Sequence, residues 1–180
     1  MPGKSCAGAT ANSQLPARPS SAAALRANSI DRACESIELA RKAAADEGLA
    51  GSCEFAVARA QDFPGTGYGL VATFDCLHDM GDPLGAARHI RSALAGDGTW
   101  MVVEPCAGDT VADNLNPVGR MYYSFSACLC VPHAISEGAG DALGNQAGEG
   151  PVAAVVHAGG FTTFRRVAQT PFNLVYEARP

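Results

Sequence analysis

The stretch 70–83, Leu-Val-Ala-Thr-Phe-Asp-Cys-Leu-His-Asp-Met-Gly-Asp-Pro, decides the fold. It begins as an apolar run typical of a buried strand and continues directly into Asp75, His78 and Asp79. Polar side chains at a strand end are costly to bury without partners. Asp82 and Pro83 then supply a helix N-cap and a favoured first helical residue. A strand, a polar loop and a helix in this order predict a ligand-binding rim at the end of a buried strand.

Helices and strands alternate on both sides of this stretch. Helices are expected over 34–47 (ended by Gly48), from 82 onward, over 115–131 and over 151–158; strands are expected over 53–58, 70–74, 99–104 (after a turn at 96–98), 162–169 and 172–178. The last two strands are separated by only two residues, so they are expected to form an antiparallel hairpin. This order predicts an α/β fold, a doubly wound, Rossmann-like and mainly parallel sheet with an antiparallel C-terminal strand. Ligands of such sheets lie at the carboxyl ends of the strands.

Composition and length limit the class of protein. The chain has 180 residues, 47% of them hydrophobic and 17% charged, which is typical of one globular domain. Its net charge of -5 and the lack of a basic stripe argue against nucleic-acid binding. No apolar run is long enough to cross a membrane, and no secretory signal is visible, so a cytoplasmic protein is expected.

Two segments differ in their organisation. Residues 1–28 are rich in Ala, Ser, Pro and Gly and lack an apolar period, so a poorly ordered N-terminal segment is expected there. Residues 29–180 are expected to form the α/β domain.

The seven cysteines are expected to be reduced, since most lie in apolar runs at irregular spacing. Cys128, Cys130 and His133 have a spacing that could form a metal triad. The two cysteines fall in an apolar helical pattern and a fourth ligand is not evident, so buried thiols are favoured and no metal site is expected.

The segments 60–71 (AQDFPGTGYGLV), 74–80 (FDCLHDM), 86–105 (AARHIRSALAGDGTWMVVEP) and 158–179 (AGGFTTFRRVAQTPFNLVYEAR) together resemble the class I S-adenosylmethionine-dependent methyltransferases. They are especially similar to a bacterial subgroup that carries a winged-helix domain ahead of the methyltransferase fold. The resemblance implies methyl transfer from S-adenosylmethionine to a small-molecule acceptor. No oligomeric state and no acceptor atom follow from it.

The resemblance also assigns cofactor-binding roles along the chain. It places Asp31 at the ribose hydroxyls, Gly8 in the glycine-rich turn beside the methionyl moiety, the group Gln61, Asp62 and Phe63 at the adenine, and the group Phe74, Asp75, His78 and Asp79 at the methionine end. The Gly-rich segment 106–147 is expected to cover the acceptor.

Departures from the family pattern leave other hypotheses open. The first strand and the glycine-rich loop are expected to be lost or degenerate, as in an N-terminally truncated enzyme, and Arg59 and Gly69 stand where relatives often have Asp. A non-catalytic α/β module that has lost cofactor binding is therefore the alternative. A nucleotide-dependent dehydrogenase is disfavoured by the antiparallel closing strand.

Each candidate also has a structural interpretation. Asp31 precedes a helix and could be its N-cap, and Gln61 and Asp62 could be turn residues. His78 is the candidate general base, because its ordinary pKa is close to physiological pH. It could instead orient the loop by bonding Asp75 or Asp79.

Overall fold

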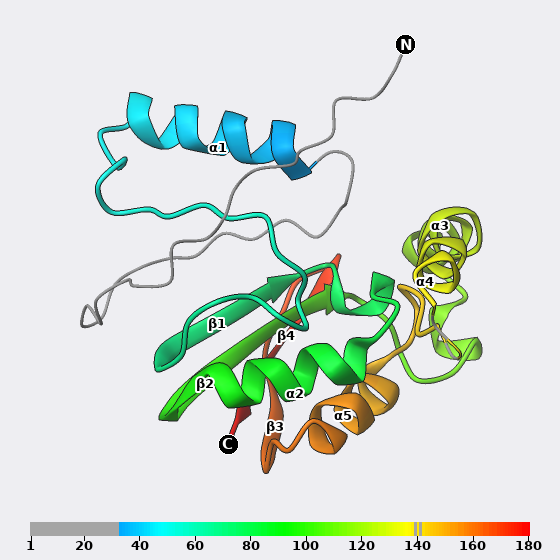
Figure 1. The fold of residues 1–180 in the computed structure, drawn as a ribbon. Helices are drawn as coiled ribbons and strands as arrows, with labels where there is room; N and C mark the ends of the chain where they lie inside the picture. The colour runs from blue at the N-terminus through cyan, green and yellow to red at the C-terminus, as the bar shows by residue number, and fades with distance from the viewer. Residues whose placement is uncertain (1–32, 139, 141) are drawn as a thin grey trace. The chain divides into compact units, whose positions relative to one another are not determined.

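The computed structural model describes residues 33–138, 140 and 142–180 (Figure 1). The chain divides into two compact units, with the boundary between Ala58 and Arg59. The expected poorly ordered segment 1–28 lies outside the described residues, as do Gly8 and Asp31.

The first unit contains the helix α1, Ala33–Asp46, which confirms the helix predicted over 34–47. Gly48 ends it in the left-handed region with a φ of 72°, a conformation that glycine adopts without the clash of a Cβ. The backbone N–H of Leu49 donates to the carbonyl of Ala44 at 2.7 Å, which closes the last turn.

The strand predicted over 53–58 is wrong. Residues 53–58 have no assigned secondary structure apart from an isolated bridge at Phe55. The Phe55 carbonyl accepts a hydrogen bond from the Arg41 guanidinium at 2.8 Å, and Val57 is exposed. Alternating polarity leads to a strand only where a neighbouring strand pairs with it. Here the Arg41 side chain of α1, and not a strand, bonds the Phe55 carbonyl.

The second unit, Arg59–Pro180, holds the sheet. Its elements in chain order are β1 (Tyr68–Phe74), the 3₁₀ turn η1 (Leu77–Asp79), α2 (Pro83–Ala93), β2 (Leu94–Pro105), the 3₁₀ turn η2 (Ala112–Asn114), α3 (Pro117–Phe125), the π-helical segment η3 (Ser126–Cys130), α4 (Val131–Ser136), α5 (Glu149–Ala158), β3 (Thr163–Gln169) and β4 (Asn173–Arg179).

The four strands form one mixed sheet in the order β1-β2-β4-β3. β1 and β2 are parallel, whereas β4 is antiparallel to both β2 and β3. The predicted closing hairpin is confirmed. The expectation of a mainly parallel sheet is not met within the described residues, where one of the three strand pairings is parallel, because β4 enters between β2 and β3.

α2 begins where the sequence predicted. The Asp82 carboxylate accepts a hydrogen bond from the Gly85 N–H at 2.7 Å, and Pro83 occupies the first turn. A Cβ at Gly85 would lie 2.0 Å from an Asp82 carboxylate oxygen, so the cap and the glycine fit one another. The helix buries Ala86, Ala87 and Ile90 among others.

β2 is longer than predicted. The expected turn at 96–98 is instead part of the strand, which begins at Leu94. Tyr68 pairs with Leu94 and Leu70 with Thr99, so the bulge between the two pairings takes up the extra residues. A Cβ at Gly98 would stand 2.7 Å from the Tyr68 carbonyl, and glycine permits this close approach.

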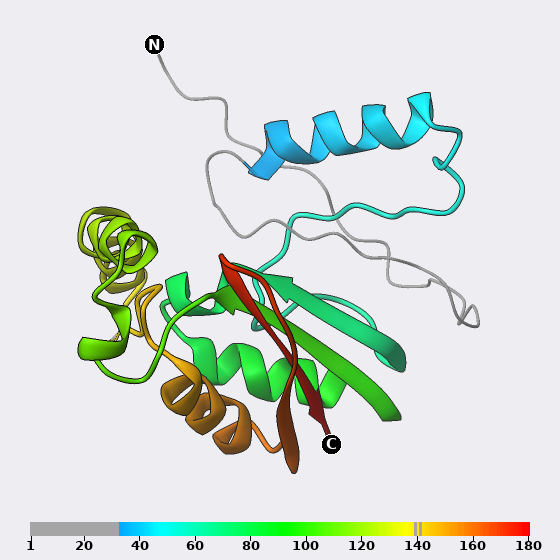
Figure 2. The same ribbon diagram turned by 180° about the vertical axis from the view of Figure 1, so that it is seen from behind.

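The core lies between one face of the sheet and the helices α2 and α5, which run side by side across it (Figures 1 and 2). Trp100 and Tyr176 are its largest fully buried side chains. The Trp100 indole N–H donates to the Thr73 hydroxyl at 3.1 Å, and its ring lies 5.2 Å from that of Phe161. The buried indole is therefore both packed and hydrogen-bonded, as a buried Trp requires.

The helix predicted over 115–131 is divided in the structure. It begins at Pro117, passes into the π-helical η3 and continues as α4. Pro132 has no N–H to bond the carbonyl four residues before it, so the α-helical ladder is interrupted there. The large apolar side chains Met121, Phe125 and Leu129 of this region are exposed, so they do not belong to the core of the second unit.

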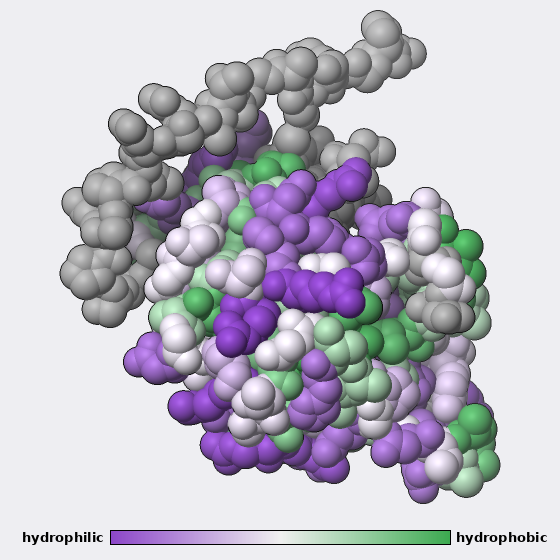
Figure 3. Space-filling model, turned by 60° about the horizontal axis from the view of Figure 1, so that its bottom comes forward, coloured by the Kyte–Doolittle hydropathy of each residue, from purple (hydrophilic) through white to green (hydrophobic). Residues whose placement is uncertain are grey.

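Figure 3 shows the hydrophobic residues of one face as separate patches among hydrophilic ones. Within residues 33–138, 140 and 142–180, the helices are too short or too polar to cross a membrane.

The N-cap of α2 can be tested by substitution. Asp82→Ala removes the acceptor of the Gly85 N–H and is expected to lower the free energy of unfolding by about 1 kcal/mol. Urea denaturation of the chain measures the change. Asp82→Asn keeps an acceptor and should lose much less, and Asp97→Ala, at an exposed position of β2, serves as the control. Equal stability of Asp82→Ala and the unsubstituted chain would contradict this role.

Candidate active site

The site lies where β1 ends. Asp75 follows the strand with a φ of 45°, in the left-handed region that non-glycine residues rarely adopt. Its N–H donates to the Val103 carbonyl at 2.8 Å, and its carboxylate accepts from the Asn173 amide at 2.7 Å. Val103 of the neighbouring strand β2 and Asn173 at the start of β4 thus hold Asp75 in this conformation. Backbone strain of this kind is concentrated at functional sites.

His78 is held by Glu104 of β2. The imidazole Nδ1 lies 2.5 Å from one carboxylate oxygen, and the other oxygen accepts the Leu77 N–H at 3.0 Å. Both side chains are about 5% exposed. A carboxylate accepts but does not donate, so Nδ1 carries the proton of this bond. Nε2 is thereby turned toward Asp79, whose carboxylate oxygen lies 3.2 Å away.

The two carboxylates change the acid–base behaviour of His78. Burial alone would lower its pKa, but the bonds to Asp79 and Glu104 outweigh burial and raise the pKa to about 9. In the free protein at neutral pH the imidazole is therefore protonated.

The neighbouring carboxyl groups differ from one another. Burial raises the pKa of Asp75, against the opposing effects of His78 and Asn173. Burial also acts to raise the pKa of Asp79, but its contacts with His78 and Cys130 prevail and hold it below the ordinary value. The two carboxyl groups near the imidazole therefore have pKa values shifted in opposite directions, upward for Asp75 and downward for Asp79.

Two thiols lie in the same region. Burial, together with the Glu104 charge, raises the pKa of Cys76 to about 12. Burial and the Asp79 carboxylate raise the pKa of Cys130 to about 12. Both are thiols rather than thiolates at neutral pH, so neither is an activated nucleophile in the free protein.

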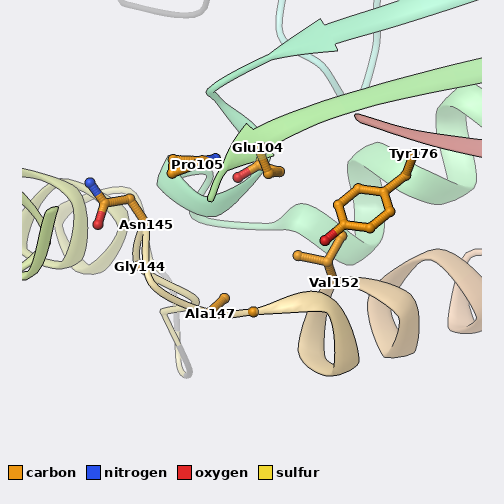
Figure 4. A pocket seen from close by; sticks show the side chains of 8 residues that line it. Glu104, Pro105, Gly144, Asn145, Ala147, Val152 and Tyr176 are labelled. Carbon is orange, nitrogen blue, oxygen red and sulfur yellow. The ribbon is translucent and has the colours of Figure 1, made fainter. Parts of the chain in front are cut away.

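A small cavity of about 10 Å³ lies behind Glu104 (Figure 4). Glu104 and Tyr176 extend from the strands toward the loop at 144–147 and Val152 of α5. The loop is tied to the site, since the Gly144 N–H donates to the His78 carbonyl at 3.3 Å. The cavity has room for about one water molecule and not for a substrate.

Phe74 is the last residue of β1, and Asp75, His78 and Asp79 lie near one another just after it. Their assignment to the methionine end stays a prediction. Phe74 is 57% exposed, so its ring is accessible. His78 does contact Asp79, as the structural interpretation expected, and it also contacts Glu104.

The adenine candidates lie apart from these residues, beside α2. The Gln61 amide donates to the Asp82 carbonyl at 3.0 Å, and the Asp62 carboxylate accepts the Arg59 N–H at 3.2 Å. Phe63 is buried, with its ring 4.4 Å from that of His89. Their side chains therefore serve the turn and the core in the free protein.

Sequence reasoning missed Glu104 as a site residue. The alternation Trp100, Val102, Glu104 places the carboxylate on the buried side of β2, and a buried acid in such a pattern needs a partner. The expectation of buried thiols is confirmed for Cys130 and is wrong for Cys128, which is exposed, because residues two apart in a helix lie on roughly opposite faces.

Comparison with known families identifies the chain. Residues 17–150 match the family model described as a methyltransferase domain, which is more than half of the chain. The chain belongs to this family and carries an S-adenosylmethionine-dependent methyltransferase domain. Comparison with curated protein sequences gave no significant match.

Solved structures of O-methyltransferases have the same fold. An O-methyltransferase family protein from Burkholderia thailandensis is 20% identical with a TM-score of 0.59, over 79% of this chain and 40% of that one. An O-methyltransferase from neocarzinostatin biosynthesis, in complex with S-adenosyl-L-homocysteine and 1,4-dihydroxy-2-naphthoic acid, is 19% identical with a TM-score of 0.58, over 79% and 38%. The mitomycin 7-O-methyltransferase is 18% identical with a TM-score of 0.54, over 80% and 39%. The chain thus spans about two fifths of the length of these proteins.

The raised pKa of His78 predicts how stability varies with pH. The folded state holds this proton more tightly than the unfolded state, whose His titrates near the ordinary 6.5. The contribution is therefore complete below pH about 6.5 and is lost as the pH rises toward about 9. Urea unfolding across this range, with EDTA present, should show stability falling with pH.

Glu104→Gln is the matched variant, because it removes one of the two charges that favour the imidazolium. Its His78 pKa, followed by NMR, should be lower, and its stability should vary less with pH. Asp97→Asn should behave as the unsubstituted chain. A His78 pKa that is unchanged in Glu104→Gln would contradict the assigned cause.

Proposed function

We propose that this chain binds S-adenosylmethionine at the carboxyl end of β1 and transfers its methyl group to a hydroxyl of a small-molecule acceptor. The observation that carries the proposal is the His78–Glu104 pair: a buried imidazole fixed through Nδ1, with Nε2 facing Asp79 at 3.2 Å. The O-methyltransferase fold of the solved relatives supports oxygen as the acceptor atom. One of those relatives holds a dihydroxynaphthoic acid, which makes a phenol a suitable probe.

The residues at the end of β1 fit this cofactor chemically. When bound, S-adenosylmethionine supplies an activated methyl group on a positively charged sulfur. Asp79, which favours its charged form, and the Asp75 carboxyl group offer acceptors and negative charge for the cationic methionine end. The exposed Phe74 ring offers a face for a cation or a base. These three side chains would hold that end of the cofactor, and Asp31 and Gly8 stay the candidates that the sequence resemblance gives for the ribose and the glycine-rich turn.

His78 acts as the general base in this proposal. The acceptor hydroxyl must lose a proton as its oxygen takes the methyl group, and Nε2 receives that proton once it is itself unprotonated. Glu104 then stabilises the resulting imidazolium and fixes the ring, as an orienting carboxylate does for a catalytic His. The Gly-rich segment 106–147 is proposed to cover the acceptor and exclude water.

The alternative is a module of the same fold that has lost cofactor binding. The side chains of Gln61 and Asp62 favour it, because both already bond within the second unit. Cofactor binding distinguishes the two functions.

Calorimetric titration with S-adenosyl-L-homocysteine tests the first function. Micromolar binding is expected, and Asp31→Ala should weaken it about tenfold or more, the scale of a hydrogen bond to a charged group. Asp46→Ala, at the end of α1, is the matched control and should bind as the unsubstituted chain does. Absence of binding by a chain whose circular dichroism shows it folded would favour the non-catalytic alternative.

His78→Gln tests the base. The variant should keep its affinity for S-adenosyl-L-homocysteine and lose about 100-fold or more in methyl transfer, the typical contribution of a general base. Transfer is measured with radiolabelled S-adenosylmethionine and 1,4-dihydroxy-2-naphthoic acid as the probe. In the unsubstituted chain the rate should rise with pH toward about 9, where the imidazole loses its proton. A variant that transfers methyl groups at an unchanged rate would show that His78 is not the base.

A further inference from the structure

Three different metal-ligating atoms converge beside the base. One ligand atom each of His78, Asp79 and Cys130 lies within 4.8 Å of the others, and His78 Nε2 is 3.2 Å from Asp79 Oδ1. Two come from η1, and the third is the last residue of the π-helical η3. His78 and Cys130 are buried, and Asp79 is half-buried. Segments more than fifty positions apart therefore meet at one point with a nitrogen, an oxygen and a sulfur.

One of these atoms has its contacts within the group of three. Asp79 Oδ1 is enclosed, and His78 Nε2 faces it at 3.2 Å and forms an ion pair with it when the imidazole is protonated. The Asp79 carboxylate also contacts the Cys130 thiol. An ion that replaced the protons on these two neighbours would keep the buried carboxylate oxygen partnered.

The donor set selects a class of ion. Imidazole nitrogen and thiolate sulfur are ligands of zinc and of similar thiophilic cations, whereas magnesium and calcium prefer oxygen. Zinc bonds of roughly 2.0–2.3 Å in a tetrahedron place neighbouring ligand atoms about 3.5 Å apart. The side chains therefore need to contract by only about 1 Å around an ion.

The surroundings suit a cation as well. Glu104 accepts from the other imidazole nitrogen at 2.5 Å, which is the carboxylate–histidine arrangement that orients zinc-bound histidines. The carboxyl group of Asp75 also acts electrostatically on His78 and Asp79. The charge near the three ligands is thus mainly negative.

We propose that His78, Asp79 and Cys130 form a binding site for a thiophilic divalent cation such as Zn²⁺, with Glu104 orienting the imidazole and a water at the fourth position. The ion takes the place of two protons, the thiol proton of Cys130 and the Nε2 proton of the imidazolium, and both are released to solvent. Cys130 is then a metal ligand as well as a buried thiol.

Occupancy of this site would prevent methyl transfer, a consequence that rests on the proposed function. The same Nε2 cannot hold an ion and accept a proton from the acceptor. Zinc is therefore an inhibitor of the proposed reaction, and a chelator restores it.

Cobalt(II) tests the metal site without any use of S-adenosylmethionine, so failure of the methyltransferase proposal leaves the test intact. Added to the full chain under reducing conditions, it should give a sulfur-to-cobalt charge-transfer band in the near ultraviolet and tetrahedral bands in the visible. Zinc should displace it at one ion per chain. Cys130→Ser should abolish the charge-transfer band, and Cys128→Ser, two residues away and exposed, should retain it.

A second variant guards against loss of folding in Cys130→Ser. Glu104→Gln keeps all three ligands and is expected to weaken zinc binding about 10- to 100-fold in calorimetry, the typical cost of removing a carboxylate that orients a ligating histidine. A charge-transfer band that survives Cys130→Ser, or that Cys128→Ser removes, would overturn the proposal. So would zinc affinity that is the same in Glu104→Gln and the unsubstituted chain.

Discussion

The bond between Glu104 and His78 is the interaction on which the site depends. A carboxylate buried on the inner face of β2 would be costly without donors, and it obtains two from the segment that follows β1, the Leu77 N–H and the imidazole. The bond therefore fixes the course of η1 as well as the orientation of one ring. Parallel pairing of β1 with β2 brings the two segments to the same end of the sheet. The His78–Glu104 bond then fixes the position of the imidazole at that end.

Local chemistry explains which parts of the fold could be predicted. Asp82 and Pro83 define where α2 begins, and Gly48 defines where α1 ends. The short connection at 170–172 defines the β3–β4 hairpin. These features depend on neighbours in sequence. The wrong strand at 53–58 and the missed extension of β2 through Gly98 depend instead on which strand lies alongside, and a pattern of residues does not contain that information.

Only the site residues that follow β1 in one continuous segment could be predicted from the sequence. Phe74 to Asp79 were identified because a polar cluster after an apolar strand is visible in the sequence. Glu104 lies 26 positions from His78, and Cys130 contacts Asp79 from a different helical segment, so neither contact follows from spacing. Gln61 and Asp62 illustrate the reverse: their polar side chains look suited to a ligand and in the free protein bond to nearby backbone.

The hydrogen bond from Asn173 to Asp75 joins residues 98 positions apart and has a consequence for the order of folding. Asp75 obtains this partner only when β4 has entered between β2 and β3, an event that requires nearly the whole chain. Contacts between such distant residues form late, since the entropy of closing a long loop must be overcome first. On the ribosome, the site would remain incomplete until the final strand emerges. A chain that ends before Asn173 would leave β2, and Glu104 with it, at an open edge.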